Sequence, residues 1–260
     1  MFGMNQVKLA VVGAGLIGKR HIELILDNPA CILAAIVAPD LAAHHQLARA
    51  LNVTLHYDLD SLFSSCPIDG VIIASPNLFH FEQAVKCIHA GIPALIEKPI
   101  THSYESGQVL VELAQEKSAK ILVGHHRVHS PIIATAKKII QANRLGKVVA
   151  IMGSALFYKP AEYFQKSTWR REAGGGPILI NMIHEIGNLR SLCGEIIAIQ
   201  AISSAAIRNF PVEDTVAINF QFASGALGTF LLSDTAASTR SWEQTSQEDK
   251  NYPPYPNEDC

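Results

Sequence analysis

The first segment whose residue types suit chemistry is a glycine-rich turn, Gly13-Ala14-Gly15-Leu16-Ile17-Gly18. Of its three glycines, the first permits a tight turn, the second lets the backbone approach a pyrophosphate, and the third allows a helix to pack closely on a strand. The amide groups of the following helix would hold the anion, because the positive end of the helix dipole lies there. The apolar run Val7–Val12 supplies the preceding strand, so the sequence predicts a dinucleotide site.

A carboxylate that binds the ribose hydroxyls is expected at the end of the second strand, about 20 residues after the glycines. The position at that strand tip is Ala38, and the nearest carboxylate is Asp40. Asp40 is almost equally suited to cap the helix that starts at Leu41, so both roles stay open. Neither Arg nor Lys stands beside it to bind a 2′-phosphate, which slightly favours NAD over NADP without deciding between them.

Two more polar segments follow apolar runs. The first is Ser75-Pro76-Asn77, with His80 three residues later, and the second is Glu97-Lys98-Pro99. Ligands of open parallel sheets bind beyond the carboxyl ends of the strands. We therefore expect both segments to face the cofactor.

The elements that must position these residues come from an alternation of short apolar runs with helical patterns, which predicts a parallel sheet covered by helices. The expected strands are Val7–Val12, Ile32–Ala38, Val53–Tyr57, Gly70–Ala74, Ala94–Glu97 and Lys120–Val123. The expected helices are Leu16–Asp27, Leu41–Leu51, Asp60–Ser65, Leu78–Ala90 and Ser103–Lys117. Residues 1–124 are thus predicted to form a Rossmann domain that binds NAD or NADP.

The pattern changes in residues 125–260, where consecutive strand-like segments predict a second α/β domain with a mainly antiparallel sheet. The expected elements are strands at Lys147–Phe157, Ile196–Ser204, Asp214–Phe222 and Ala226–Ser233, and helices at Pro131–Asn143 and Pro177–Cys193. Residues 234–260 are rich in small polar and acidic residues and are expected to be loop or disordered tail. We expect this domain to be incomplete at its C-terminal end.

The composition limits the possible partners and compartment. A net charge of -2 gives no electrostatic reason to expect nucleic acid or an anionic membrane as partner, and no window of about 18 apolar residues predicts a membrane span. The five cysteines are odd in number and widely spaced, which indicates reduced thiols in a cytoplasmic protein. We expect a small-molecule substrate.

Four motifs in order resemble one family over the chain to about Ser238. They are the glycine turn, Ser75-Pro76-Asn77, Ile96-Glu97-Lys98-Pro99, and Gly174-Gly175-Gly176 ahead of a helix with His184. The chain resembles the Gfo/Idh/MocA oxidoreductases. The resemblance implies a Rossmann domain joined to an α/β domain whose open, mainly antiparallel sheet often forms the interface of a homo-oligomer. It also implies oxidation or reduction of sugars, cyclitols or related compounds with NAD or NADP.

The resemblance also assigns roles. Lys98 is the active-site lysine, which would donate a hydrogen bond to the reacting oxygen; otherwise it is a surface lysine before a turn-forming proline. His184 is the active-site histidine, which would exchange the hydroxyl proton as a general base or acid; otherwise it is a hydrogen-bonded core histidine. Trp169 and Arg170 would lie near the nicotinamide, although plain packing is equally open for Trp169. Asn181, on the helix face of His184, would hold a substrate hydroxyl or orient the imidazole.

Two positions depart from the family's pattern. Family members commonly carry Asp where this chain has Ile180 and often where it has Gly187. Together with the short C-terminal part, these changes favour a second interpretation, a non-catalytic dinucleotide-binding sensor or regulator. A third interpretation is a shortened product without activity. The presence of Lys98 and His184 favours the enzyme.

A cluster of basic residues follows the sixth expected strand and includes His125, His126, Arg127 and His129. Zinc sites need a closed set of Cys, His or carboxylate ligands, and the chain has neither a partnering Cys pair nor an H-E-x-x-H helix. We therefore expect no metal. His126 and Arg127 are instead expected to contact substrate hydroxyls or a carboxylate.

Overall fold

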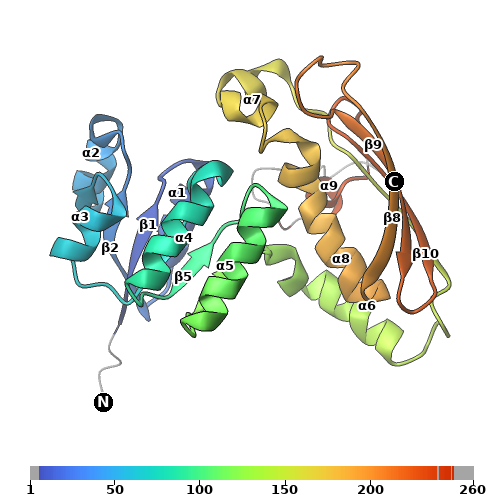
Figure 1. Cartoon of the computed structure of the whole chain (residues 1–260), viewed down its shortest axis with the longest axis horizontal. Helices are drawn as coiled ribbons and strands as arrows, with labels where there is room; N and C mark the ends of the chain where they lie inside the picture. Colours follow the sequence, from blue (N-terminus) through green and yellow to red (C-terminus); the bar gives the residue numbers. More distant parts are fainter. Residues whose placement is uncertain (1–5, 239, 247, 249–260) are drawn as a thin grey trace. The chain divides into compact units, whose positions relative to one another are not determined.

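The structure is a computed structural model that describes residues 6–238, 240–246 and 248 (Figure 1). Contacts within the chain divide it into two compact units, Met1–Gly124 and His125–Cys260. No helix among the described residues is both long and apolar enough to cross a membrane.

The first unit contains a six-stranded sheet in which every pairing is parallel. Its strand order is β3-β2-β1-β4-β5-β6. The strands are β1 (Val7–Val12), β2 (Cys31–Val37), β3 (Thr54–His56), β4 (Gly70–Ile73), β5 (Ala94–Ile96) and β6 (Ile121–Val123). The order reverses between β1 and β4, and open α/β sheets bind their ligands at such a reversal. The predicted Rossmann arrangement is confirmed.

Helices cover both faces of this sheet, as its apolar strands require. They are α1 (Leu16–Asp27), α2 (Leu41–Leu51), α3 (Leu59–Ser65), the short 3₁₀ turn η1 (Asn77–Phe79), α4 (His80–His89) and α5 (Tyr104–Glu116). One apolar core joins α1 and α2 to the sheet, with Ile22 and Ile36 buried in it. The other joins α3, α4 and α5 to the opposite face, with Leu62 and Ile73 fully buried. Helices α4 and α5 run side by side (Figure 1).

The second unit contains a four-stranded sheet in the order β7-β10-β9-β8. The strands are β7 (Ala150–Leu156), β8 (Ile196–Ser204), β9 (Thr215–Phe222) and β10 (Leu227–Ser233). The pairings of β9 with β8 and with β10 are antiparallel, whereas β10 and β7 are parallel. The sheet is therefore mixed and mainly antiparallel, as predicted.

One face of this sheet packs on helices. The helical elements are η2 (His126–His129), α6 (Pro131–Gln141), α7 (Ala161–Gln165), η3 (Thr168–Arg171), the π-helix η4 (Ile178–Met182), α8 (Ile183–Cys193) and α9 (Trp242–Thr245). Met182 and Leu189 pack against alternate residues of β9, among them Phe220 and Phe222. The residues between these, such as Asn219, are exposed on the other face because strand side chains alternate.

Two features of the second unit differ from the sequence-based expectation. The expected loop 234–260 contains the short helix α9, while residues 239, 247 and 249–260 lie outside the described part of the chain. The expected helix Pro177–Cys193 opens with a π-helical turn rather than an α-helical one. The tail was predicted from composition alone, and composition cannot reveal a helix of a single turn.

Candidate active site

The glycine turn has the geometry that its spacing predicts. Gly13 has a φ of +85°, and a Cβ there would lie 2.8 Å from the Cα of Ser75. A Cβ on Gly18 would lie 1.8 Å from the carbonyl oxygen of Gly13. By contrast, a Cβ on Gly15 would meet no heavy atom within 4 Å. The first and third glycines thus allow the turn to close, and the second leaves open space beside the backbone.

The start of helix α1 fits a phosphate group. Gly15 is the N-cap residue of this helix, no side chain caps it, and its first turn holds no acidic residue. The first N–H groups of a helix have no partner within the helix, and they carry the positive end of the helix dipole. With Gly15 and Leu16 exposed, this helix end is an open cradle for the pyrophosphate of a dinucleotide.

The two candidate ribose contacts lie at the tip of β2. Asp40 is exposed, and its carboxylate accepts a hydrogen bond of 3.0 Å from the backbone N–H of Ala43. Asp40 is therefore the N-cap of α2, which is the second of the two roles that its sequence position allowed. Ala38 is buried, with 2% of its surface exposed, so any contact from it to a cofactor would come from its backbone.

The polar segment after β4 lies directly beside the glycine turn. Ser75 Oγ donates a hydrogen bond to Oε1 of Gln83, and Asn77 is buried with 7% exposed. His80 is fully buried, and its Nδ1 and Nε2 lie 2.8 Å from the carbonyl oxygens of Pro99 and Ser75. The imidazole of His80, which we expected among the cofactor ligands, thus has no exposed surface with which to contact one.

Glu97 and Lys98 follow the end of β5, the neighbour of β4. Glu97 Oε1 lies 2.7 Å from Nε2 of His21 on α1, and Oε2 accepts a hydrogen bond of 3.2 Å from the backbone N–H of Lys98. Burial alone would raise the pKa of Glu97, but the hydrogen bond and charge of His21, together with Lys98, hold that pKa below its usual value of 4.5. Glu97 is therefore an ionised group whose side chain is only 14% exposed, and Lys98 beside it is half-buried.

His184 lies in the first turn of α8 in the second unit. Its side chain is buried, with 7% exposed, and its ring packs edge-on against the ring of His126 at a centroid distance of 4.7 Å. Asn181 belongs to the preceding π-helix, and such single π-turns occur frequently at functional sites. Asn181 lines a hollow together with Glu185, four residues further on.

This hollow of the second unit has a volume of about 200 Å³. Arg127 lines it, is buried and forms an ion pair with Glu185, and its guanidinium carbon lies 5.4 Å from the ring centre of Trp242. Arg240 also lines the hollow. Arg127, expected to bind substrate, is thus held by a carboxylate and an indole within its own unit.

Trp169 and Arg170 lie on η3, the segment before the triple glycine. Arg170 donates a hydrogen bond of 2.6 Å to the carbonyl oxygen of Tyr163, and its guanidinium lies 3.8 Å from the centre of that ring. A Cβ on Gly175 would lie 2.6 Å from the carbonyl oxygens of both Trp169 and Arg170. The triple glycine therefore lets η3 pack directly against the backbone that leads into the helix of His184.

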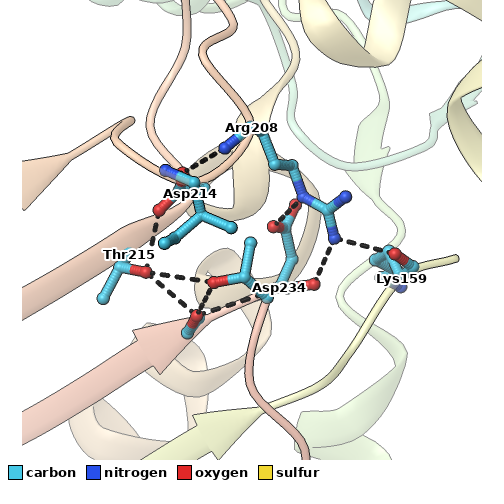
Figure 2. Close-up of polar contacts among 8 residues, drawn as sticks. Lys159, Arg208, Asp214, Thr215 and Asp234 are labelled. Carbon is cyan, nitrogen blue, oxygen red and sulfur yellow. Dashed lines mark hydrogen bonds and ion pairs between the residues drawn. The ribbon is translucent and has the colours of Figure 1, made fainter. Parts of the chain in front are cut away.

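A buried polar cluster anchors the segment that leads to η3 (Figure 2). Arg208 donates hydrogen bonds to the Asp234 carboxylate and to the carbonyl oxygen of Lys159, at 2.6 and 2.7 Å. Asp214 accepts two backbone N–H bonds, including that of Arg208, and one from the Thr215 hydroxyl. Burial raises the pKa of Asp234, although the hydrogen bond and charge of Arg208 act against this.

Sequence reasoning missed several of these side chains. His21, Glu185 and Trp242 contact predicted site residues, but none belongs to a recognised motif. The positions of His21 and Glu185 offered a weak signal: one is on the helix of the glycine turn and the other adjoins His184. Among the described residues, no group of three or more His, Cys, Asp and Glu side chains is arranged to hold a metal ion.

Comparison with known proteins extends over both units. Residues 7–125 match the oxidoreductase family with an NAD-binding Rossmann fold, and residues 133–247 match the GFO/IDH/MocA C-terminal domain. A Rossmann unit followed by a mixed-sheet unit is thus the two-domain arrangement that these two family models describe in succession. The chain belongs to the Gfo/Idh/MocA family of oxidoreductases.

Two relatives share 28% and 26% of the aligned residues with this chain. The chain is 28% identical over 193 residues to the 2,7-anhydro-N-acetylneuraminate hydratase of Mediterraneibacter gnavus. This alignment covers 74% of this chain and 50% of the relative. It is 26% identical over 245 residues to the inositol 2-dehydrogenase of Rhizobium meliloti. That alignment covers 92% of this chain and 71% of the relative. The chain thus spans about half the length of the first and under three quarters of the second.

A solved structure supports the fold. The WlbA dehydrogenase from Bordetella pertussis, determined with NADH and UDP-GlcNAcA, superimposes with a TM-score of 0.85 at 23% identity. The match covers 89% of this chain and 72% of that one.

Proposed function

We propose that this chain transfers a hydride between NAD or NADP and a CH–OH group of a sugar, a cyclitol or a related polyhydroxylated molecule. The observation that carries the proposal is the open phosphate cradle at α1, with Lys98 at the carboxyl end of a strand in the same sheet. The inositol 2-dehydrogenase relative supports a cyclitol-like substrate. NAD is slightly favoured over NADP, because neither Arg nor Lys stands beside Ala38 and Asp40 to bind a 2′-phosphate.

The chain's residues would bind both reactants and handle the proton. When bound, the nicotinamide supplies or accepts the hydride. The Lys98 ammonium donates a hydrogen bond to the reacting oxygen and stabilises negative charge that develops there. The His184 imidazole takes up the hydroxyl proton in oxidation and returns it in reduction.

Further contacts orient the two reactants. Substrate hydroxyls are bound by Asn181, His126 and Arg127. The remaining cofactor contacts come from the backbone at Ala38, from the segment Ser75–Asn77, from Glu97, and from Trp169 and Arg170. Ile180 stands where the family usually has an aspartate, and the neighbouring Asn181 cannot accept a proton as a carboxylate could, so His184 carries the proton exchange in this chain.

Turnover tests the proposal. We expect NADH to quench tryptophan fluorescence, and at least one member of a panel of sugars, cyclitols and hydroxy acids to change absorbance at the reduced-nicotinamide band. Product masses separate net oxidation from the net hydration named for one relative. Lys98→Ala should lower turnover by about 100- to 1000-fold, to a residual rate that can still be measured, and leave NADH affinity within about twofold, because Lys98 acts on the substrate oxygen. Lys117→Ala, in an exposed lysine, is the control and should change neither.

Two outcomes would contradict the proposed enzymatic function. NADH binding without turnover of any panel member by the wild-type chain favours the sensor or regulator. Normal activity in Lys98→Ala refutes the proposed chemistry.

We also propose a second copy of this chain as a partner, docked on the face of the sheet of β7, β10, β9 and β8 that no described helix covers. Apolar side chains point outward there, including Met152, Ile202 and Leu227, which are 87%, 77% and 60% exposed. Met152 and Ile202 line a depression of about 600 Å³ on this face. Exposed apolar patches of this kind on a sheet are typical of protein interfaces.

The four described cysteines are free thiols, which supports the cytoplasm as the compartment.

A further inference from the structure

The turn that carries Lys98 is held at both ends by histidines from two different helices. Glu97 precedes Lys98 and Pro99 follows it. His21 of α1 contacts the Glu97 carboxylate, and His80, the first residue of α4, contacts the Pro99 carbonyl oxygen. Neither histidine belongs to the residues to which the proposed reaction gives a chemical role.

The contact of His21 links the nucleotide cradle to the lysine. His21 lies on the helix that begins at the glycine turn, three residues after Gly18. Its Nε2 and Glu97 Oε1 are 2.7 Å apart, and both side chains are largely buried, at 17% and 14% exposed. The other carboxylate oxygen accepts the backbone N–H of Lys98. A Cβ on Gly124 would lie 3.0 Å from Glu97 Oε1, so the carboxylate occupies a fitted space.

The contact of His80 joins two loops at the carboxyl edge of the sheet. The ring is fully buried and spans from the Ser75 carbonyl oxygen after β4 to the Pro99 carbonyl oxygen after β5, each at 2.8 Å. A neutral imidazole donates to one of these oxygens and an imidazolium donates to both. The fully buried ring lies between the loop beside the glycine turn and the loop of Lys98 and contacts the backbone of both.

We propose that His21 and His80 are positioning residues that hold the backbone of Lys98 in place relative to the nucleotide cradle. The inference rests on the proposed role of Lys98 and deepens it. A displacement of the reacting group by about 1 Å can lower a rate about 100-fold. Two side chains that fix the turn from opposite ends therefore control how well the ammonium reaches its substrate.

Hydrogen exchange tests this positioning without any substrate. In His21→Leu and in His80→Leu, which remove the ring donors, we expect amide exchange in the peptide that covers Glu97 to Thr101 to rise at least about tenfold. Peptides from β1 should keep their wild-type rates. His21→Gln keeps an N–H donor and should restore protection. The control is His89→Leu, which changes an exposed histidine at the other end of α4. Unchanged exchange at Glu97–Thr101, or an equal rise throughout the unit, would overturn the proposal.

Kinetics provide the second measurement, with the best panel substrate of the wild-type chain. His21→Leu should lower kcat by about 10- to 100-fold with a smaller change in KM, and His21→Gln should recover most of the rate. In the Lys98→Ala background, His21→Leu should cause no further loss. A further loss there would show that His21 acts on something other than Lys98. Full activity of Lys98→Ala would refute the proposed function, whereas the exchange result stands separately from it.

Discussion

Glu97 shows how a single buried carboxylate depends on its neighbours. Its pKa lies below the usual 4.5 because the hydrogen bond and charge of His21, with the charge of Lys98, outweigh the effect of burial. A carboxylate whose pKa is lowered by folding stabilises the folded state above its unfolded pKa. This stabilisation is lost as the pH falls through the folded pKa.

Glu97→Gln should therefore destabilise the first unit by about 1.5–3 kcal/mol near neutral pH, the usual range for a hydrogen bond to a charged group. The difference between wild type and variant should shrink as the pH falls below 4.5. Urea unfolding followed by circular dichroism between pH 3 and 7 measures it. A difference in unfolding free energy that stays constant over this range would mean that His21 and Lys98 do not stabilise the ionised form of Glu97.

At the scale of residues, spacing along the sequence predicted the residues of local motifs but not the contacts between residues far apart in the chain. Gly13, Gly15 and Gly18 were predictable because a turn between strand and helix imposes local backbone requirements on each. The His21–Glu97 pair was not, because its members lie 76 positions apart and meet only once the helix crossovers are fixed. The sequence left the role of Asp40 open, and the structure makes it the N-cap of α2.

At the scale of elements, the glycine turn allows a stability effect and a binding effect to be separated. Gly15→Ala should leave the melting temperature nearly unchanged, because its φ is −72° and no heavy atom lies within 4 Å of the new Cβ. The methyl group should occupy the space of the pyrophosphate and raise the Kd for NADH by about tenfold or more. Calorimetry and thermal unfolding measure the two effects.

Gly13→Ala should instead lower stability and NADH binding together. It pays about 1–3 kcal/mol for the positive φ, and its Cβ also collides with Ser75. Gly91→Ala is the matched control, since Gly91 has a φ of +68° and open space around it. If Gly15→Ala bound NADH as tightly as the wild type, the cradle would not be the nucleotide site.

Periodicity predicted the regular elements well. The bounds of β1, α1, α2 and β8 agree with the pattern to the residue, because glycine, proline and cap residues mark their ends. The π-turn before α8 was not predictable, since an added residue in one turn leaves the apolar spacing of the helix almost intact. The short helices α7 and α9 are too brief for a periodic signal.

At the scale of the whole molecule, the uncovered sheet face leads to a prediction about assembly. Met152→Lys combined with Ile202→Lys should shift the chain toward monomer, because buried charges oppose an apolar interface. Light scattering after size exclusion measures the mass. Ile207→Lys is the control: this residue is 75% exposed and lies outside the sheet, in the loop after β8. A monomeric wild-type chain, or an unchanged mass in the double variant, would contradict the proposed interface.

The central proposal joins one residue from each unit in a single reaction, so the most direct test is a double-mutant cycle between Lys98 and His184. The rates of Lys98→Ala, His184→Ala and the double variant are compared with wild type under saturating NAD and substrate. Groups that act together on one oxygen are strongly non-additive. We predict that the double variant is no more than about threefold slower than the slower single variant. Two losses that simply multiply, or a single variant with normal turnover, would contradict the account.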